Sequence, residues 1–198
     1  MASDTTRPQV VTPSMFAKIR AQLGQQAEYD IAWAEALGAP PSAEQFAREA
    51  IFVICNSGMR ATVAQGIFER CMHALRGATP VIEVFGHVGK AAAIEHIWAN
   101  QEALLSGYLA AADKLEFCAS LPWIGHITKY HLAKNLGADV AKPDVHLQRL
   151  ADLQGVSAQA LCEGLAREVG LRVATVDTVL WRACSMGVLN SHTAELAA

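Results

Sequence analysis

Apolar residues recur at helical spacing along most of this chain, as expected for helices that each bury one face. Glycine, proline and short polar clusters interrupt the pattern where connections between helices are expected. A β-prone run at residues 81–88 departs from the pattern, but one short run cannot make a sheet. The pattern therefore predicts an all-α fold. We expect helices over residues 13–37 and 42–54, a further helix after the CNSG interruption to about residue 75, and then helices over 91–105, 109–119, 126–136, 145–153, 157–169 and 173–186.

The first residues differ in composition from the rest of the chain. Residues 1–13 are rich in Thr, Pro and Ser, and this predicts a flexible N-terminal arm. The chain has 198 residues, of which 52% are hydrophobic, so one full core or two small lobes that share it can form. No repeat or low-complexity linker follows the arm. We therefore predict a single domain over residues 14–198.

The segment LPWIG at residues 121–125 is a short turn between two helical patterns. This arrangement predicts a helix-hairpin-helix over about residues 111–137. Gly125 can adopt a positive φ and bring the backbone close to a ligand, and the amides that open the second helix face outward with the positive end of its dipole. A DNA phosphate is a suitable ligand for such a hairpin.

A carboxylate follows the hairpin after a short connection. Gly137 ends the second helix of the hairpin, and Asp144 opens the next one, in which Val145, Leu147 and Leu150 are apolar. Aspartate is a common N-cap, so a purely structural role is one interpretation. The alternative is a catalytic carboxylate that stabilises positive charge on a sugar while an N-glycosidic bond is hydrolysed.

These residues resemble the helix-hairpin-helix DNA glycosylase superfamily. The resemblance is carried by LPWIG followed by DVHLQRL at residues 144–150, by the Gly89-Lys90-Ala91 helix start, and by IFVICNSGMRATVAQGIFERC at residues 51–71. These patterns occur in the family's order. The resemblance implies two helical lobes around a base-binding cleft.

Two positions depart from the family pattern. Bifunctional members carry a Schiff-base lysine two residues after the last glycine of the hairpin, and this chain has Ile127 there, which cannot form an imine. The nearest lysine, Lys129, lies on another face of the helix. The resemblance thus implies a monofunctional hydrolase without a lyase step. Trp123 replaces a glycine that is common in the family, and its indole is a candidate wedge or stacking surface.

Composition limits the possible partners and cofactors. The formal charge of −3 and the pI of about 6.1 argue against general electrostatic coating of DNA, but residues 126–149 carry four basic against two acidic side chains, which suits a small phosphate footprint. The five cysteines show no C-x-x-C spacing, so we expect reduced core thiols and no iron-sulfur cluster. No metal or cofactor is expected for catalysis. Because we find no membrane span and no signal peptide, we expect a cytoplasmic protein.

The candidate site residues fall into three groups. Asp144 is the candidate catalytic residue. The predicted base-binding residues lie on the 56–60 loop and on an earlier helix: Asn56, Ser57, Met59, Tyr29 and Trp33. The predicted contacts to the DNA backbone are Arg60, Lys90, Trp123, Gly125, His126, Lys129 and Arg149. For each, a structural role as cap, core or solvated side chain is the alternative.

A narrower resemblance concerns the kind of DNA. The spacing of EYDIAWAE, AIFVICNSGM and the hairpin segment is similar to a phage-associated branch of the superfamily. That branch includes α-glutamyl/putrescinyl thymine pyrophosphorylases and anti-phage glycosylases that remove α-glucosyl-hydroxymethylcytosine. Three hypotheses follow: a monofunctional glycosylase acting on a modified base in double-stranded DNA, a base-modifying transferase, and a non-catalytic DNA-binding module. We favour the glycosylase.

Overall fold

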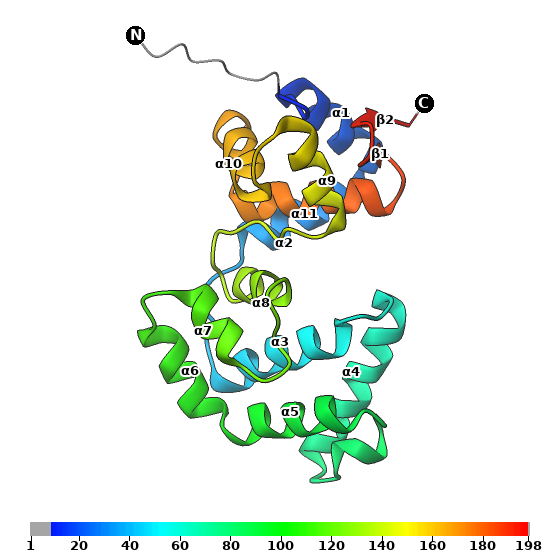
Figure 1. The fold of residues 1–198 in the computed structure, drawn as a ribbon. Helices are drawn as coiled ribbons and strands as arrows, with labels where there is room; N and C mark the ends of the chain where they lie inside the picture. Colours follow the sequence, from blue (N-terminus) through cyan, green and yellow to red (C-terminus); the bar gives the residue numbers. More distant parts are fainter. Residues whose placement is uncertain (1–8, 198) are drawn as a thin grey trace. The chain divides into compact units, whose positions relative to one another are not determined.

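The helices of this chain are grouped in two compact units (Figure 1). The computed structural model describes residues 9–197. Residues 38–138 form what we call the inserted unit, and the chain before and after them forms the terminal unit. The predicted all-α class is confirmed, since β-structure within residues 9–197 is limited to one two-stranded ribbon.

The inserted unit is built around one long helix, α3, which packs against α4, α5, α6 and α8. Phe46, Ile51 and Ile54 of α3 are fully buried, because apolar residues recur on its inner face. The elements are α3 (Ala43–Asn56), α4 (Ala61–Arg76), the 3₁₀ turn η1 (Val81–Glu83), α5 (Val88–Ala99), α6 (Gln101–Ala110), α7 (Lys114–Ser120) and α8 (Thr128–Asn135).

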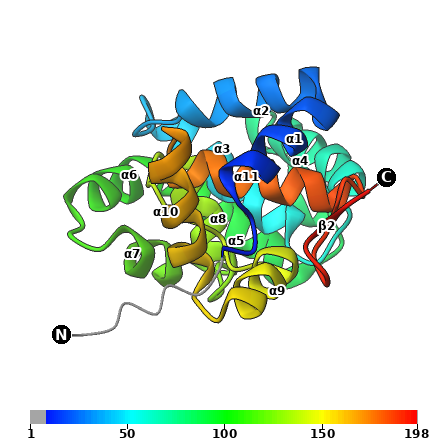
Figure 2. The ribbon, with the colours of Figure 1, turned by 90° about the horizontal axis from the view of Figure 1, so that it is seen from above.

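The terminal unit is arranged around α11, which runs across it with α2 and α9 on opposite sides (Figure 2). Val176, Val179 and Leu180 of α11 are fully buried in the core of this unit. Its elements are α1 (Pro13–Leu23), α2 (Gln25–Glu35), α9 (Val145–Gln154), α10 (Ala158–Val169), α11 (Val173–Ser185), β1 (Leu189–Asn190) and β2 (Glu195–Leu196).

Side-chain caps set many of the helix starts, as the sequence signals indicate. In each case an oxygen of the residue before the helix accepts hydrogen bonds from amides of the first turn. These capping residues are Thr12, Ser42, Asp113, Asp144 and Ser157. Residues 1–8 of the predicted arm lie outside the described residues. Further along that arm, Val11 is buried and Thr12 caps α1.

Two predicted divisions of the chain into helices are wrong, and one element was not predicted. The single helix expected over residues 13–37 is two helices, because Gly24 has φ 57° and ψ −130° and cannot continue a helix. Two helices were expected over residues 91–119, but three form, since Asn100 ends α5 and Asp113 opens α7. The short β1–β2 ribbon was not predicted. Residues 81–88 contain no strand, as expected.

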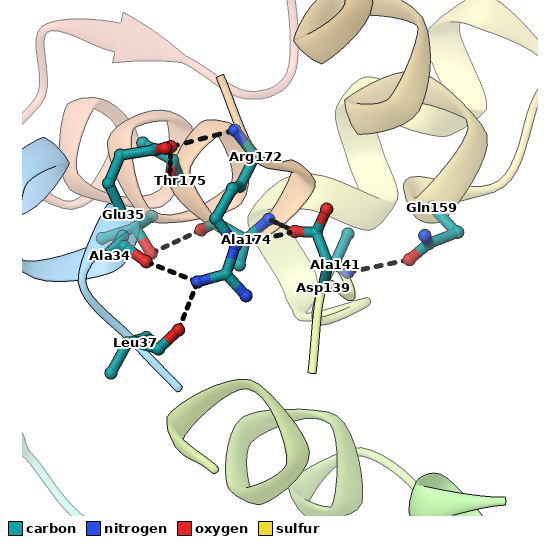
Figure 3. A network of polar contacts seen from close by, with 10 residues as sticks. Ala34, Glu35, Leu37, Asp139, Ala141, Gln159, Arg172, Ala174 and Thr175 are labelled. Atoms are coloured by element: carbon teal, nitrogen blue, oxygen red, sulfur yellow. Dashed lines mark hydrogen bonds and ion pairs between the residues drawn. The ribbon is translucent and has the colours of Figure 1, made fainter. Parts of the chain in front are cut away.

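The chain passes between the units twice, and both passages are fixed locally. In the inserted unit, Gly137 has φ 90° and lies directly against the backbone of Gly38. In the terminal unit, the Arg172 guanidinium donates hydrogen bonds to the carbonyls of Ala34 and Leu37, at 2.9 and 2.7 Å, and lies 3.7 Å from Asp139 (Figure 3). Each unit therefore holds its own ends of the two connections together.

The contact between Gly137 and Gly38 predicts a specific requirement for glycine. A Cβ on Gly137 would lie 2.4 Å from the carbonyl carbon of Gly38, and the φ of 90° is itself unfavourable for alanine. We expect Gly137→Ala to destabilise the protein by about 3 kcal/mol. Denaturant unfolding followed by circular dichroism measures this.

Gly66→Ala in α4 is the matched control in the same unit. Its Cβ would meet one arginine atom at 3.7 Å, an ordinary contact, so helix propensity should stabilise that variant by about 0.5 to 1 kcal/mol. If Gly137→Ala were as stable as the wild type, the close packing of the two connections would be disproved.

Candidate functional site

The predicted hairpin is present between α7 and α8. Leu121 and Ile124 are buried and anchor the turn, and the Ile124 amide donates to the Leu121 carbonyl at 3.2 Å. The positive φ expected at Gly125 lies instead at Trp123, which has φ 63°. A residue with a side chain in this conformation costs about 1 to 2 kcal/mol, because Cβ approaches the following carbonyl.

The amides of the hairpin divide into two kinds. The Gly125 N–H donates to Thr128 Oγ1 at 2.7 Å, so the turn itself uses that donor. The next three amides, those of His126, Ile127 and Thr128, donate to no acceptor in the part of the chain that the structure describes. They stand at the N-terminal end of α8, where unsatisfied N–H groups and the helix dipole favour an anion.

The hairpin lines an open pocket of about 400 Å³. Ser57, which follows α3 and begins the loop that leads to α4, also lines this pocket. Sequence reasoning assigned Ser57 to base recognition and the hairpin to the DNA backbone, and the structure brings these two groups together. The complete lining is Ser57, Trp123, Ile124, Gly125, His126, Ile127 and Thr128.

Lys90 fixes the Ser57 side of this pocket. Its side chain is buried, with 5% of the residue exposed, and its Nζ donates to the Ser57 carbonyl at 2.6 Å. Burial also lowers the pKa of Lys90. The phosphate contact predicted for Lys90 required an exposed ammonium, and the structure places that ammonium on the loop instead.

The first turn of α5 fixes the Trp123 side. The His87 ring accepts a hydrogen bond from the Lys90 amide and packs edge-on against the Trp123 indole, with ring centroids 4.8 Å apart. A Cβ on Gly89 would lie 2.5 Å from Cζ2 of the same indole, so only glycine allows this contact. Trp123 nevertheless remains 47% exposed.

The other predicted site residues of the inserted unit differ in their exposure and in the contacts that their side chains already make. Lys129 Nζ forms an ion pair with Glu116 at 2.8 Å, and that hydrogen bond raises the pKa of Lys129. Arg60 is exposed just before α4 and makes no side-chain capping bond. Asn56 and Met59 are half-buried on either side of Gly58, which has φ 73°.

Asp144 begins α9 in the terminal unit. Its Oδ1 accepts hydrogen bonds from the amides of His146 and Leu147, at 3.0 and 3.1 Å, so the capping role is present. Its Oδ2 accepts no hydrogen bond from the described residues and lies 4.0 Å from Lys142 Nζ. The side chain is 13% exposed. One carboxylate oxygen thus caps the helix, and the other has only the ion pair with Lys142.

Three further predicted residues belong to the terminal unit. Tyr29 and Trp33 lie one turn apart on α2 and are 68% and 40% exposed, which differs from the buried pair that a core role requires. Arg149 on α9 is half-buried.

Sequence reasoning missed several residues that shape these sites. Histidine is an uncommon cap, so no sequence signal indicates that His87 caps α5 and supports Trp123. Ser191, whose hydroxyl lies 3.1 Å from His146 Nδ1, lies in the turn between the two unpredicted strands. Thr128 could have been found, because a threonine three residues after a turn glycine is a common backbone-capping arrangement.

The fold is that of a helix-hairpin-helix DNA glycosylase. The solved structure of an 8-oxoguanine DNA glycosylase of Thermotoga maritima is similar, with a TM-score of 0.63 and 16% sequence identity. The similarity covers 85% of this chain and 93% of that one. No protein-family model and no curated protein sequence matches this chain.

None of the helices within residues 9–197 is both long enough and apolar enough to cross a membrane. Within the same range, no group of three or more His, Cys, Asp or Glu side chains is arranged to hold a metal ion.

The two oxygens of Asp144 predict a difference between two substitutions. Asparagine retains an oxygen that can cap α9, so Asp144→Asn should change the free energy of unfolding by less than about 0.5 kcal/mol. Asp144→Ala removes the cap and should cost about 1 kcal/mol. Thermal melts of the three proteins measure this. Equal loss in both variants would show that the cap is not what Asp144 contributes to stability.

Proposed function

We propose that this protein is a monofunctional DNA glycosylase, and the observation that carries the proposal is the placement of Asp144. One oxygen of this residue caps α9, and the other accepts no hydrogen bond from the described residues and lies 4.0 Å from Lys142 Nζ. The fold of the chain is shared with an 8-oxoguanine DNA glycosylase. Because the cap fixes the carboxylate, its second oxygen is oriented before any substrate binds, as electrostatic catalysis requires.

The reaction follows from the chemistry of the N-glycosidic bond. The bond between C1′ and the base nitrogen breaks, and its electron pair leaves with the base, so positive charge develops on the sugar. The Asp144 carboxylate stabilises this charge and accepts a proton from the water whose oxygen attacks C1′. The departing base takes up a proton from solvent, and Asp144 returns its proton to solvent, so the products are a neutral free base and an abasic site. The base must leave the duplex stack first.

The hairpin supplies a contact to the DNA backbone in this proposal. The three amides of His126, Ile127 and Thr128 suit one phosphate group at the start of α8. Exposed Arg60 adds a positive charge from the neighbouring loop. Tyr29 and Trp33 offer exposed aromatic faces in the terminal unit, and such faces stack on bases.

The lysines of the inserted unit that lie near the hairpin favour hydrolysis without a lyase step. Ile127 lines the pocket at the position where the bifunctional enzymes carry their lysine. Lys129 is held by Glu116, and Lys90 is buried against the Ser57 carbonyl. An amine nucleophile must reach C1′ of the sugar, and both ammonium groups are already bound to an acceptor of the inserted unit.

We further propose that the substrate is double-stranded DNA that carries a modified base, as the similarity to phage-associated sequences suggests. Glucosyl-hydroxymethylcytosine is the specific candidate. A base-modifying transferase would use the same base flipping but leave the glycosidic bond intact, and a passive binding module would use Asp144 only as a cap.

The direct test measures abasic sites. The wild type and Asp144→Asn are incubated with unmodified DNA, damaged-base oligonucleotides and DNA containing glucosyl-hydroxymethylcytosine, followed by alkaline cleavage. We expect alkali-sensitive strand breaks with the wild type and at least a hundredfold lower rate with Asp144→Asn, on the order expected for loss of one charge-stabilising group. Borohydride should trap no covalent complex, because no lysine forms an imine.

The outcomes separate the three hypotheses. A modified base that disappears without an abasic site would support the transferase. Binding without any chemical change on these substrates would leave only the passive module. A covalent complex trapped by borohydride would contradict the assignment as a monofunctional enzyme.

Salt dependence tests which cations meet phosphate. Each phosphate contact contributes about 0.9 to the slope of log Kd against log salt concentration on duplex DNA. We expect Arg60→Gln to reduce the slope by about that amount. Lys90→Met should leave it unchanged, because the ammonium is already bound to Ser57. Exposed Lys18 on α1 is the control, as Lys18→Gln alters charge alone. If Lys90→Met reduced the slope, Lys90 would contact a phosphate after all, as the sequence predicts.

A further inference from the structure

We propose that Trp123 is a stacking surface for an unpaired nucleobase in the hairpin pocket, and that the first turn of α5 holds this surface in position. The inference rests on the proposed DNA-binding function and adds a specific subsite to it. All of the residues involved belong to the inserted unit.

The first argument is the backbone conformation of Trp123. Its φ of 63° is favourable for glycine and unfavourable for a large side chain. Conformations of this kind persist where surrounding structure fixes them, and they are concentrated at functional sites. A tryptophan placed only to fill the core would not need to remain 47% exposed.

The second argument is the support behind the indole. Gly89 and His87 pack against it, and the Gly89 contact leaves no room for a Cβ. Lys90, the next residue, holds the Ser57 carbonyl at 2.6 Å. One turn of helix therefore positions both the Trp123 wall and the Ser57 wall of the pocket. His87, Gly89 and Lys90 act as positioning residues.

The third argument is the chemistry of the lining. The pocket of about 400 Å³ offers an indole and the apolar side chains of Ile124 and Ile127. The unpaired amides of His126 to Thr128 lie along the same lining. A flat apolar ring linked to a phosphate matches this combination, and a nucleotide has both. Because a paired base is enclosed in the duplex, the occupant must be unpaired.

The test uses 2-aminopurine, a fluorescent base whose emission falls when it stacks. We use the full chain with a single strand that carries one 2-aminopurine, a duplex in which that base faces an abasic analogue, and a fully paired duplex. The wild type should quench the emission in the first two and much less in the third. Fluorescence anisotropy on the same DNAs gives Kd.

Four variants locate the effect. Trp123→Gly suits the positive φ, so it should fold normally, lose the quenching and raise Kd roughly 5- to 150-fold. Trp123→Phe should retain most of the quenching. Gly89→Ala should displace the indole and weaken the quenching although Trp123 is present. Trp98→Phe, at a half-buried position of α5, is the control and should match the wild type.

Thermal melts confirm folding in each case. The proposal is overturned if Trp123→Gly quenches as the wild type does, or if the wild type quenches no unpaired 2-aminopurine. Abasic-site formation is measured separately with the modified-base DNA. If the protein makes abasic sites but Trp123 does not quench 2-aminopurine, the glycosylase assignment stands and the stacking surface is disproved. If Trp123 quenches 2-aminopurine but no abasic sites form, the stacking surface stands and the glycosylase assignment is contradicted.

Discussion

The fold depends on a junction within the terminal unit. The chain leaves this unit after Leu37 and returns to it at Asp139, and the departing and returning segments must be held together. Arg172 makes this junction: its guanidinium binds carbonyls of the departing segment and pairs with Asp139 of the returning one. The Arg172 amide and Thr175 hydroxyl both donate to Glu35, which adds the end of α2 (Figure 3). These bonds join residues 135 to 140 positions apart, so the closing contacts are strongly non-local.

The same unit contains a second long-range pair with a different physical character. Arg182 of α11 binds both oxygens of Asp30 on α2, at 2.7 and 3.1 Å, and Asp30 is only 3% exposed. Bidentate geometry compensates the desolvation of such a carboxylate, whereas removing one partner would leave a buried charge. The apolar core around α11 buries Val176, Val179 and Leu180. The Arg182–Asp30 pair adds a directional contact between α2 and α11.

Local signals predicted the fold well, and non-local ones were not visible in the sequence. The all-α class, the hairpin and the start of α9 at Asp144 follow from periodicity, turn residues and capping preferences. The break at Gly24 was missed because glycine within a helical pattern is often tolerated. The burial of Lys90 could not be predicted, since the Ser57 carbonyl that its ammonium binds is 33 residues earlier in the chain.

In the candidate site, a structural role and a functional role do not exclude each other. A capping role and a catalytic role are compatible in Asp144, because its two oxygens are in different environments. Trp123 presents the opposite case. A glycine at this position would make the turn without strain, so local stability does not explain the tryptophan. The turn could form without the indole that packs against Gly89. The aromatic surface that this half-exposed indole adds to the pocket therefore explains the tryptophan best.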